Sequence, residues 1–94
     1  MRMIERSSVF KRDYRRIKST PRYCKIIETL LRDILQYLIV DEPPAPNYRD
    51  HALGGGWNGY RECHVKPDLL LIYQKSNQNI LRLARLGSHS ELFN

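Results

Sequence analysis

The sequence predicts an α+β fold in which two helices pack on one face of an antiparallel sheet, in the order β-α-α-β-β-β. Ninety-four residues suffice for one hydrophobic core but not for two, so we expect residues 1–94 to form a single domain. Apolar residue types make up 41% and charged types 28%, the balance of a globular protein. The apolar spacing changes from a helical to a strand period after residues 41–48, whose three prolines exclude both helix and central strand.

The first half of the chain is predicted to form a helical hairpin after a short strand over residues 3–6. Apolar side chains recur at helical spacing over residues 9–18, which predicts an amphipathic helix with a buried stripe of Phe10, Tyr14 and Ile17. Thr20 is suited to cap a second helix, and Pro21 is suited to its first position. We expect this helix over residues 22–40, where a broad apolar face consists of Ile26, Ile27, Leu30, Leu31, Ile34, Leu35 and Leu38.

The second half is predicted to form strands after a polar, glycine-rich loop over residues 50–58. Alternating side chains predict a strand over residues 60–65. Residues 69–73 are apolar on both faces, which is typical of a central strand, and a third strand is expected over residues 79–86. The Ser-x-x-Glu pattern of residues 88–91 is a capping box, which predicts one last helical turn.

Positive charge is concentrated in the first quarter of the chain. Residues 1–25 contain nine Lys or Arg and two acidic side chains, a net charge of +7, whereas the remaining residues have a net charge of −1. A one-sided basic surface indicates a polyanionic partner, which is a nucleic acid, an anionic membrane surface or an acidic protein. The alternative is a solvated helix face that only keeps a small protein in solution.

Several classes of protein are disfavoured by the sequence. The N-terminus has no apolar core of a signal peptide, and the longest uncharged stretches are far shorter than the ~20 residues of a membrane span. Cys24 and Cys63 fit neither a paired metal motif nor a disulfide scaffold. We therefore expect a soluble, cytoplasmic protein without a membrane partner.

The residues most suited to chemistry lie in the second half. His51, His64 and His89 occur at loops or strand ends, Asp68 precedes the central strand, and Arg85 lies near the end of the last strand. Adjacent antiparallel strands would bring these side chains to one edge of the sheet. Histidine can supply both the base and the acid of metal-independent RNA cleavage, and arginine can hold the charge that grows on phosphorus. The residues thus suggest an RNA-directed protein with a ribonuclease site.

Metal and thiol chemistry fit the sequence less well. The histidine spacings of 13 and 25 match no zinc motif, and the isolated Asp50 and Asp68 do not form the carboxylate cluster of a Mg²⁺ nuclease. Strand alternation points Cys63 to the face opposite His64, which disfavours a Cys-His nucleophile pair. We expect neither a metal nor another cofactor.

Structural interpretations compete with the catalytic one. Lone histidines are usually surface residues or satisfied hydrogen-bonding groups, and Asp68 is typical of a turn that opens a strand. Arg85 is equally suited to an ion pair with Glu62 or Glu91. Base stacking and core packing suit the nearby aromatic residues equally, namely Trp57, Tyr60 and Phe93.

Two segments carry a family resemblance. The first lies within residues 50–73 and consists of Asp-His-Ala-Leu at residues 50–53 and Gly-Trp-Asn-Gly-Tyr-Arg-Glu-Cys-His-Val-Lys-Pro-Asp-Leu-Leu-Leu-Ile-Tyr at residues 56–73. The second is Arg-Leu-Gly-Ser-His-Ser-Glu-Leu-Phe at residues 85–93. In this order they resemble the YafQ-type branch of the RelE/ParE toxin superfamily, and the length and element order agree over the whole chain. The resemblance implies a RelE-like fold and the toxin of a type II toxin–antitoxin pair. This toxin would be a ribosome-dependent, metal-independent endoribonuclease that cleaves mRNA in the A site, leaving 2′,3′-cyclic phosphate and 5′-hydroxyl ends.

The resemblance also implies roles for individual residues. His89 would be the general acid, and Asp68 the general base, acting through His51 or in place of it. Arg85 would stabilise the transition state, while His51 and His64 orient the phosphate and the ribose. Leu69 stands where relatives often carry Trp, which implies a different codon preference or rate.

Partners follow from the same resemblance. The basic first quarter would dock on ribosomal RNA, with RNA contacts from Arg12, Arg15, Arg16, Lys18, Arg22 and the terminal aromatic Phe93. The mRNA substrate and an antitoxin with an acidic segment that folds on binding would be the other partners. The alternatives are a ParE-like toxin that inhibits DNA gyrase without nuclease activity, and a non-enzymatic basic RNA-binding module.

Overall fold

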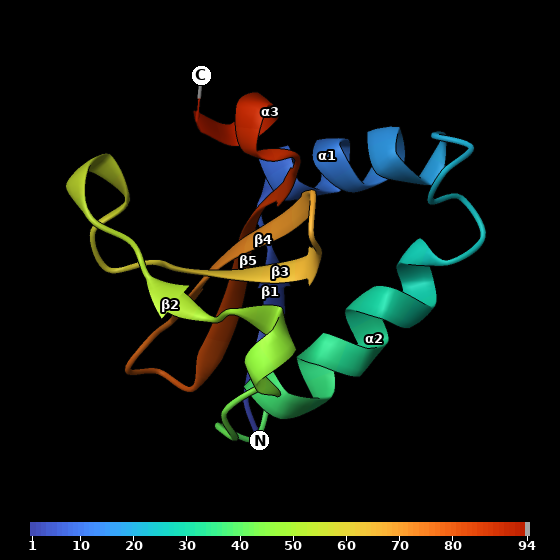
Figure 1. Cartoon of the computed structure of the whole chain (residues 1–94). Helices are drawn as coiled ribbons and strands as arrows, with labels where there is room; N and C mark the ends of the chain where they lie inside the picture. The colour runs from blue at the N-terminus through green and yellow to red at the C-terminus, as the bar shows by residue number, and fades with distance from the viewer. Residues whose placement is uncertain (94) are drawn as a thin grey trace.

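The computed structural model describes residues 1–93 as an α+β fold built on one five-stranded sheet (Figure 1). Its strand order is β1-β5-β4-β3-β2. The helices and strands are β1 (Met3–Arg6), α1 (Ser8–Lys18), α2 (Ile27–Leu38), β2 (His51–Ala52), β3 (Arg61–Lys66), β4 (Leu69–Lys75), β5 (Ile80–Gly87) and α3 (His89–Phe93). Two short 3₁₀ turns, η1 (Pro46–Tyr48) and η2 (Gly55–Trp57), flank β2.

The sheet separates two apolar layers. On one side α1 and α2 pack on the sheet, and the core there includes Phe10, Ile34, Cys63, Leu71 and Leu83. On the other side a smaller cluster is formed by Leu70, Ile72, Ala84 and Leu92, with Trp57 and Tyr60 partly buried against it. Both faces of β4 are therefore buried, as the apolar run of residues 69–73 predicts.

The predicted fold class is confirmed, with two corrections to the sheet. β1 pairs parallel to β5, from Met3 opposite Ile80 to Arg6 opposite Leu83, so the sheet is mixed and not wholly antiparallel. The helical hairpin follows β1 in the chain, and the strands β3, β4 and β5 come after it as an antiparallel meander. The last of them, β5, lies beside β1 and runs in the same direction. The second correction is β2, a two-residue strand inside the predicted loop that pairs antiparallel with β3.

The helical hairpin also differs from the prediction at its turn. α1 begins as expected, where the Ser7 hydroxyl accepts a hydrogen bond from the Phe10 backbone N–H at 2.9 Å. Thr20 does not cap the second helix, because its hydroxyl donates back to the Arg16 carbonyl oxygen at 3.0 Å. Thr20 thus completes α1, residues 21–26 form turns, and α2 starts at Ile27, five residues later than predicted.

Within residues 1–93, no helix combines the length and apolar character that crossing a membrane requires.

Candidate active site

The strand register aligns two of the predicted site residues across the sheet. His51 lies opposite Glu62, Glu62 opposite Ile72, and Ile72 opposite Arg85. Residues that face each other across neighbouring strands point to the same side of a sheet. His51, Glu62 and Arg85 therefore arise from one face, the face without α1 and α2.

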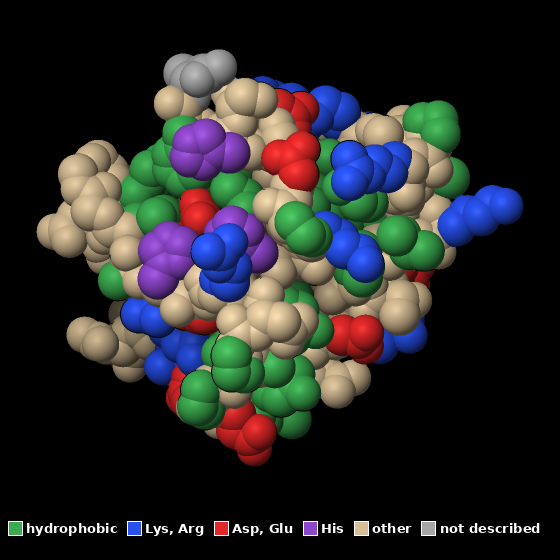
Figure 2. Space-filling view, viewed as in Figure 1, with side chains coloured by type: hydrophobic (Ala, Val, Ile, Leu, Met, Phe, Trp, Pro, Cys, Tyr) green, Lys and Arg blue, Asp and Glu red, His purple; other side chains and the backbone are tan. Residues whose placement is uncertain are grey.

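A second row continues this face toward α3. His64 lies opposite Leu70, and Leu70 lies opposite Gly87, the last residue of β5. His89 follows two residues later as the first residue of α3. All three histidines are visible on this face of the molecule, two side by side and the third higher, at α3 (Figure 2).

A buried carboxylate joins the two adjacent histidines. Glu62 Oε1 lies 3.5 Å from His51 Nε2 and 3.5 Å from His64 Nε2. The two imidazole rings are 6.3 Å apart between centroids, and Glu62 is only 5% exposed. A protonated imidazole at either position would form an ion pair with this carboxylate, and the three side chains together carry a net positive charge only when both rings are protonated.

The tautomer of His51 is fixed by its own backbone. Its Nδ1 lies 2.7 Å from the carbonyl oxygen of Arg49. A carbonyl oxygen only accepts hydrogen bonds, so Nδ1 carries the proton and Nε2 has the lone pair when the ring is neutral. Arg49 adopts a left-handed conformation with φ of 51°, which turns its carbonyl toward the ring. Nε2 is thus the proton-accepting atom of His51.

α3 brings His89 and Phe93 to the upper end of the same face. The predicted capping box is confirmed: the Ser88 N–H donates to Glu91 Oε1 at 2.8 Å, and the Glu91 N–H donates to the Ser88 hydroxyl at 3.2 Å. The His89 and Phe93 rings lie 5.0 Å apart between centroids. His89 is exposed, and its imidazole is free to reach a bound ligand.

Arg85 is held by a partner that the sequence did not indicate. Its Nε donates to Asp13 Oδ2 at 2.7 Å and its Nη2 to Asp13 Oδ1 at 3.2 Å, so neither Glu62 nor Glu91 is its hydrogen-bonded partner. Hydrogen bonding to Asp13, opposed by desolvation, raises the pKa of Arg85. The Arg85 side chain remains 26% exposed, which leaves part of the guanidinium open to a phosphate.

Asp68 and Cys63 are not joined to the histidines within residues 1–93. Asp68 is exposed in the turn between β3 and β4, and within residues 1–93 no ion pair or side-chain hydrogen bond joins it to a histidine. Cys63 belongs to the core beneath the helices, which confirms that it points away from His64. Burial, aided by the charges of Asp50 and Glu62, raises the pKa of the Cys63 thiol, so it is a poor nucleophile. Within the part of the chain that the structure describes, no three His, Cys, Asp or Glu side chains are arranged to hold a metal ion.

The basic residues predicted to bind RNA divide into free and engaged groups. Arg12 and Arg15 are exposed on α1. Arg16 donates to Asp13 at 3.0 Å and pairs with Glu91 at 3.2 Å, so it ties α1 to α3. The other two contact aromatic rings: Lys18 lies over Tyr14, and Arg22 lies over Tyr23.

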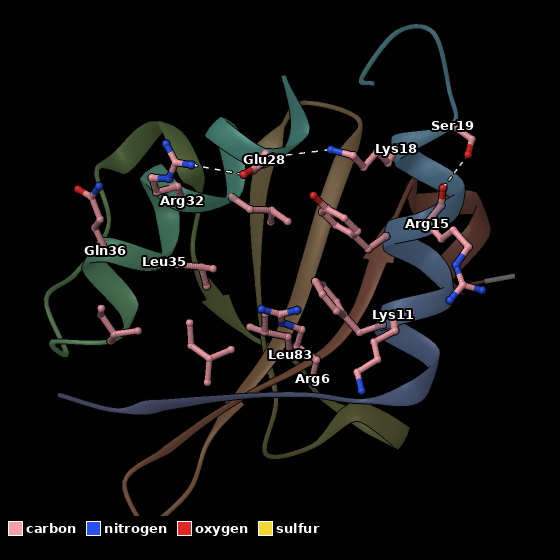
Figure 3. Close-up of a pocket in the computed structure, with 15 residues that line it drawn as sticks. Arg6, Lys11, Arg15, Lys18, Ser19, Glu28, Arg32, Leu35, Gln36 and Leu83 are labelled. Atoms are coloured by element: carbon pink, nitrogen blue, oxygen red, sulfur yellow. Dashed lines mark hydrogen bonds and ion pairs between the residues drawn. The ribbon is translucent and has the colours of Figure 1, made fainter. Parts of the chain in front are cut away.

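A groove of about 900 Å³ separates α1 from α2 on the helix side of the sheet (Figure 3). Its floor is apolar and includes Phe10, Leu31, Leu35 and Leu83. Cations surround it, and Glu28 is the one acidic residue among the lining residues Ile4, Arg6, Phe10, Lys11, Tyr14, Arg15, Lys18, Ser19, Glu28, Leu31, Arg32, Leu35, Gln36, Ile39 and Leu83. This groove and the histidine cluster lie on opposite sides of the sheet.

Two functional residues were missed from the sequence, although each had a signal. Glu62 lies two positions before His64, so strand alternation places both on one face. Asp13 lies between Phe10 and Ile17 on the buried stripe of α1, at i+3 from the first and i−4 from the second. A carboxylate on a buried face requires partners, and this signal could have led to Arg85.

Comparison with solved structures defines the class of protein as a bacterial toxin. A metal-bound toxin from Helicobacter pylori superimposes with a TM-score of 0.89 at 46% identity, covering 99% of this chain and 100% of that one. YafQ from Escherichia coli BL21(DE3) gives a TM-score of 0.85 at 33% identity, with both chains fully covered. The YafQ of an E. coli DinJ–YafQ complex gives 0.84 at 35% identity, again over all of both chains.

The chain belongs to the YafQ family of bacterial toxins of type II toxin–antitoxin systems, whose family model matches residues 2–94. The mRNA interferase toxin YafQ of E. coli K12 is 45% identical over 64 residues, which cover 67% of this chain and 68% of that protein. The resemblance noted in the sequence is thereby confirmed.

Proposed function

We propose that this protein is the endoribonuclease of a toxin–antitoxin pair, which cleaves mRNA on the ribosome without a metal ion. The observation that carries this proposal is the alignment of His51, Glu62 and His64 on one face, with His89 beyond them. The relative from E. coli K12 is named an mRNA interferase, which supports the same reaction class.

The proposed reaction is an attack of the ribose 2′-oxygen on the adjacent phosphorus. His51 Nε2 takes the 2′-hydroxyl proton, the new P–O bond closes a 2′,3′-cyclic phosphate, and the bond to the 5′-oxygen breaks. His89 gives a proton to the departing 5′-oxygen, which leaves as a 5′-hydroxyl. Arg85 and the protonated form of His64 neutralise the charge that grows on phosphorus.

His51 is a better candidate for the base than Asp68. Its Nδ1 proton is committed to the Arg49 carbonyl at 2.7 Å, which leaves Nε2 as an acceptor on the site face. Asp68 is exposed and lies in the β3–β4 turn. We assign Asp68 to substrate binding at the edge of the site, where its carboxylate can accept hydrogen bonds from ribose or base.

The ribosome is proposed as the platform that supplies mRNA. Exposed cations on α1, led by Arg12 and Arg15, suit ribosomal RNA phosphates, and Phe93 beside His89 suits stacking on an RNA base. Lys18 and Arg22 extend the cationic surface along the hairpin turn. Arg16 contributes charge but is also part of the structural link to α3.

An antitoxin is proposed as the second partner, as in the E. coli DinJ–YafQ complex. The groove between α1 and α2 has an apolar floor and a cationic border, which suits an acidic amphipathic segment that folds on binding. An antitoxin seated there would cover Arg15 and Lys18 and compete with ribosome docking.

A translating ribosome programmed with a defined mRNA tests the proposal. EDTA-treated wild type should cleave this mRNA and leave naked mRNA intact, whereas His89→Gln should lose roughly 10²–10⁴-fold in rate through loss of the general acid. Cleavage that requires added metal would overturn the metal-independent mechanism. Failure of the wild type to cleave, with inhibition of DNA gyrase instead, would identify a ParE-like toxin, and RNA binding without either activity would identify a binding module.

A further inference from the structure

A polar network lies behind His51, on the helix side of the sheet. Asp50 Oδ1 accepts hydrogen bonds from Arg61, at 2.7 Å from Nε and 2.6 Å from Nη2. Asp50 Oδ2 accepts a hydrogen bond from the Tyr73 hydroxyl. We call Asp50, Arg61 and Tyr73 the Asp50 network.

The network connects β3 and β4 to the residue that precedes β2. Arg61 on β3 and Tyr73 on β4 face each other in register, and Asp50 immediately precedes β2. Tyr73 is 1% exposed, and the side chain of Asp50 is 10% exposed, so both partners are largely shielded from water. Burial and the charge of Asp50 raise the pKa of Tyr73, so its hydroxyl remains a proton donor.

β2 itself is too short to fix a catalytic side chain. It has two residues, and its ladder to β3 consists of His51 opposite Glu62 and Ala52 opposite Arg61. Short edge strands are weakly held by their own hydrogen bonds. The next anchor along the chain is the Leu53 N–H, which donates to the Tyr60 carbonyl at 2.9 Å. On the other side of His51, Asp50 provides the anchor through its side chain.

We infer that the Asp50 network is a positioning device that holds His51 Nε2 against the substrate hydroxyl and keeps the Arg49 carbonyl on Nδ1. Tyr73, Arg61 and Asp50 act through His51 and are positioning residues. This inference rests on the proposed role of His51 as the base. Loss of the Tyr73 hydroxyl frees one oxygen of Asp50 and lets β2 shift, which changes the position and tautomer of His51 together.

Paired substitutions of buried tyrosines test the inference. Tyr73→Phe keeps the ring and removes the hydroxyl that binds Asp50. Tyr23→Phe is the matched control, since Tyr23 is also buried but its hydroxyl has no hydrogen-bond partner within residues 1–93. On programmed ribosomes Tyr73→Phe should lower kcat by roughly 10–100-fold with little change in KM, because a misplaced base slows chemistry more than binding. Tyr23→Phe should match the wild type.

A double-mutant cycle separates positioning from a general structural role. In a His51→Gln background, Tyr73→Phe should change kcat by less than about 2-fold, because the residue through which the network acts is already gone. An equal loss in both backgrounds would overturn the inference.

The imidazole of His51 provides a readout that does not depend on activity. In ¹⁵N spectra the wild type should show the Nδ1-protonated tautomer, and Tyr73→Phe should show a mixture of tautomers. If Tyr73→Phe does not fold, Arg61→Ala tests the same network through a side chain that is 44% exposed. Unchanged His51 signals in a folded variant would refute positioning. A changed tautomer in a protein whose wild type cleaves no RNA would refute the proposed function and leave the positioning of His51 intact.

Discussion

At the scale of single residues, the buried carboxylate of Asp13 links α1 to β5. It is 2% exposed, and its two carboxylate oxygens accept hydrogen bonds from Arg85, from Arg16 and from the Leu86 backbone N–H at 3.0 Å. The Leu86 N–H lies on β5 beyond the end of β1, so Asp13 satisfies a strand edge that no neighbouring strand covers. The same carboxylate thus completes the sheet and orients the arginine of the candidate active site.

Asp13→Asn should destabilise the fold strongly. An amide cannot satisfy four donors, and two guanidinium groups lose their partner, so we expect a loss of about 3–5 kcal/mol in the free energy of unfolding. Urea titrations measure this loss, and Asp33→Asn on the exposed side of α2 is the control. Equal midpoints for the two variants would contradict the role of Asp13.

The stability of the wild type should fall in acid because of the same carboxylate. Burial opposes ionisation of Asp13, but hydrogen bonds from Arg85, Leu86 and Arg16 outweigh it and lower the pKa below its ordinary value. A carboxyl group with a lowered pKa in the folded state stabilises the protein above its unfolded pKa, and that stabilisation is lost as the pH falls through the folded value. The difference in unfolding free energy between wild type and Asp13→Asn should therefore shrink below about pH 4. A difference independent of pH from 7 to 2 would exclude this linkage.

At the scale of elements, α3 is too short to be stable without help. It has five residues, and helices of this length are marginal in water. The capping box of Ser88 and Glu91 fixes its start, and Glu91 Oε2 also pairs with Arg16 Nε at 3.2 Å. Gly87 permits this close packing, because a Cβ there would lie 3.0 Å from Glu91 Oε1 and 3.1 Å from Arg16 Nη2.

Glu91→Ala should release α3 without unfolding the sheet. Loss of the cap and of the pair with Arg16 should lower the free energy of unfolding by about 1–2 kcal/mol. The Leu92 amide, which donates to the Ser88 carbonyl at 3.1 Å, should exchange its hydrogen faster. Cleavage should fall roughly 10-fold because His89 loses its fixed position. Glu42→Ala in the exposed proline-rich segment is the control, and unchanged exchange at Leu92 would show that the cap is dispensable.

At the scale of the whole molecule, the candidate active site and the cations of α1 lie on different elements of the fold. The histidines lie on the sheet face that α1 and α2 leave open, while five of the nine basic residues of the first quarter lie on α1, namely Lys11, Arg12, Arg15, Arg16 and Lys18. A substrate at the histidines and a polyanion at α1 can therefore be bound at the same time.

Reversing the charge of Arg12 and Arg15 together should weaken ribosome binding and leave the fold intact. Both side chains are exposed, and each lost phosphate contact should lower the slope of log K against log salt by about 1. Sedimentation with ribosomes at several salt concentrations measures the slope. Arg32→Glu on α2 is a single-charge control outside the basic segment. Unchanged binding by the double variant would exclude α1 as the docking surface.

The sequence predicted the elements whose signals are long and regular. The apolar stripe of α1, the double-sided run of β4 and the capping box at Ser88 all lie where local patterns indicated. β2 escaped prediction because a two-residue strand has no period, and because the partners of the adjacent Asp50, namely Arg61 and Tyr73, lie 11 and 23 residues further along the chain.

Part of the candidate active site could be predicted, because strand alternation and register are local patterns. Register brings His51 beside His64, and alternation alone indicates that Glu62 shares their face. The contact between Arg85 and Asp13 joins the two ends of the chain, and no local pattern determines which of ten acidic residues reaches which arginine. The parallel pairing of β1 has the same cause, because strand direction at an edge is decided by the path of the helical hairpin.

The pairing of β1 with β5 sets the order in which the chain can fold. β1 can pair only after β5 has been synthesised, because Met3 lies opposite Ile80. Asp13 of α1 likewise accepts its backbone hydrogen bond from Leu86, which also lies on β5. Contacts between such distant segments make folding slow, and a nascent chain that ends before β5 can close neither the sheet nor the core beneath its helices. Arg85 and His89 emerge with and just after that strand. The candidate active site therefore cannot assemble on a nascent chain before β5 and α3 have been synthesised.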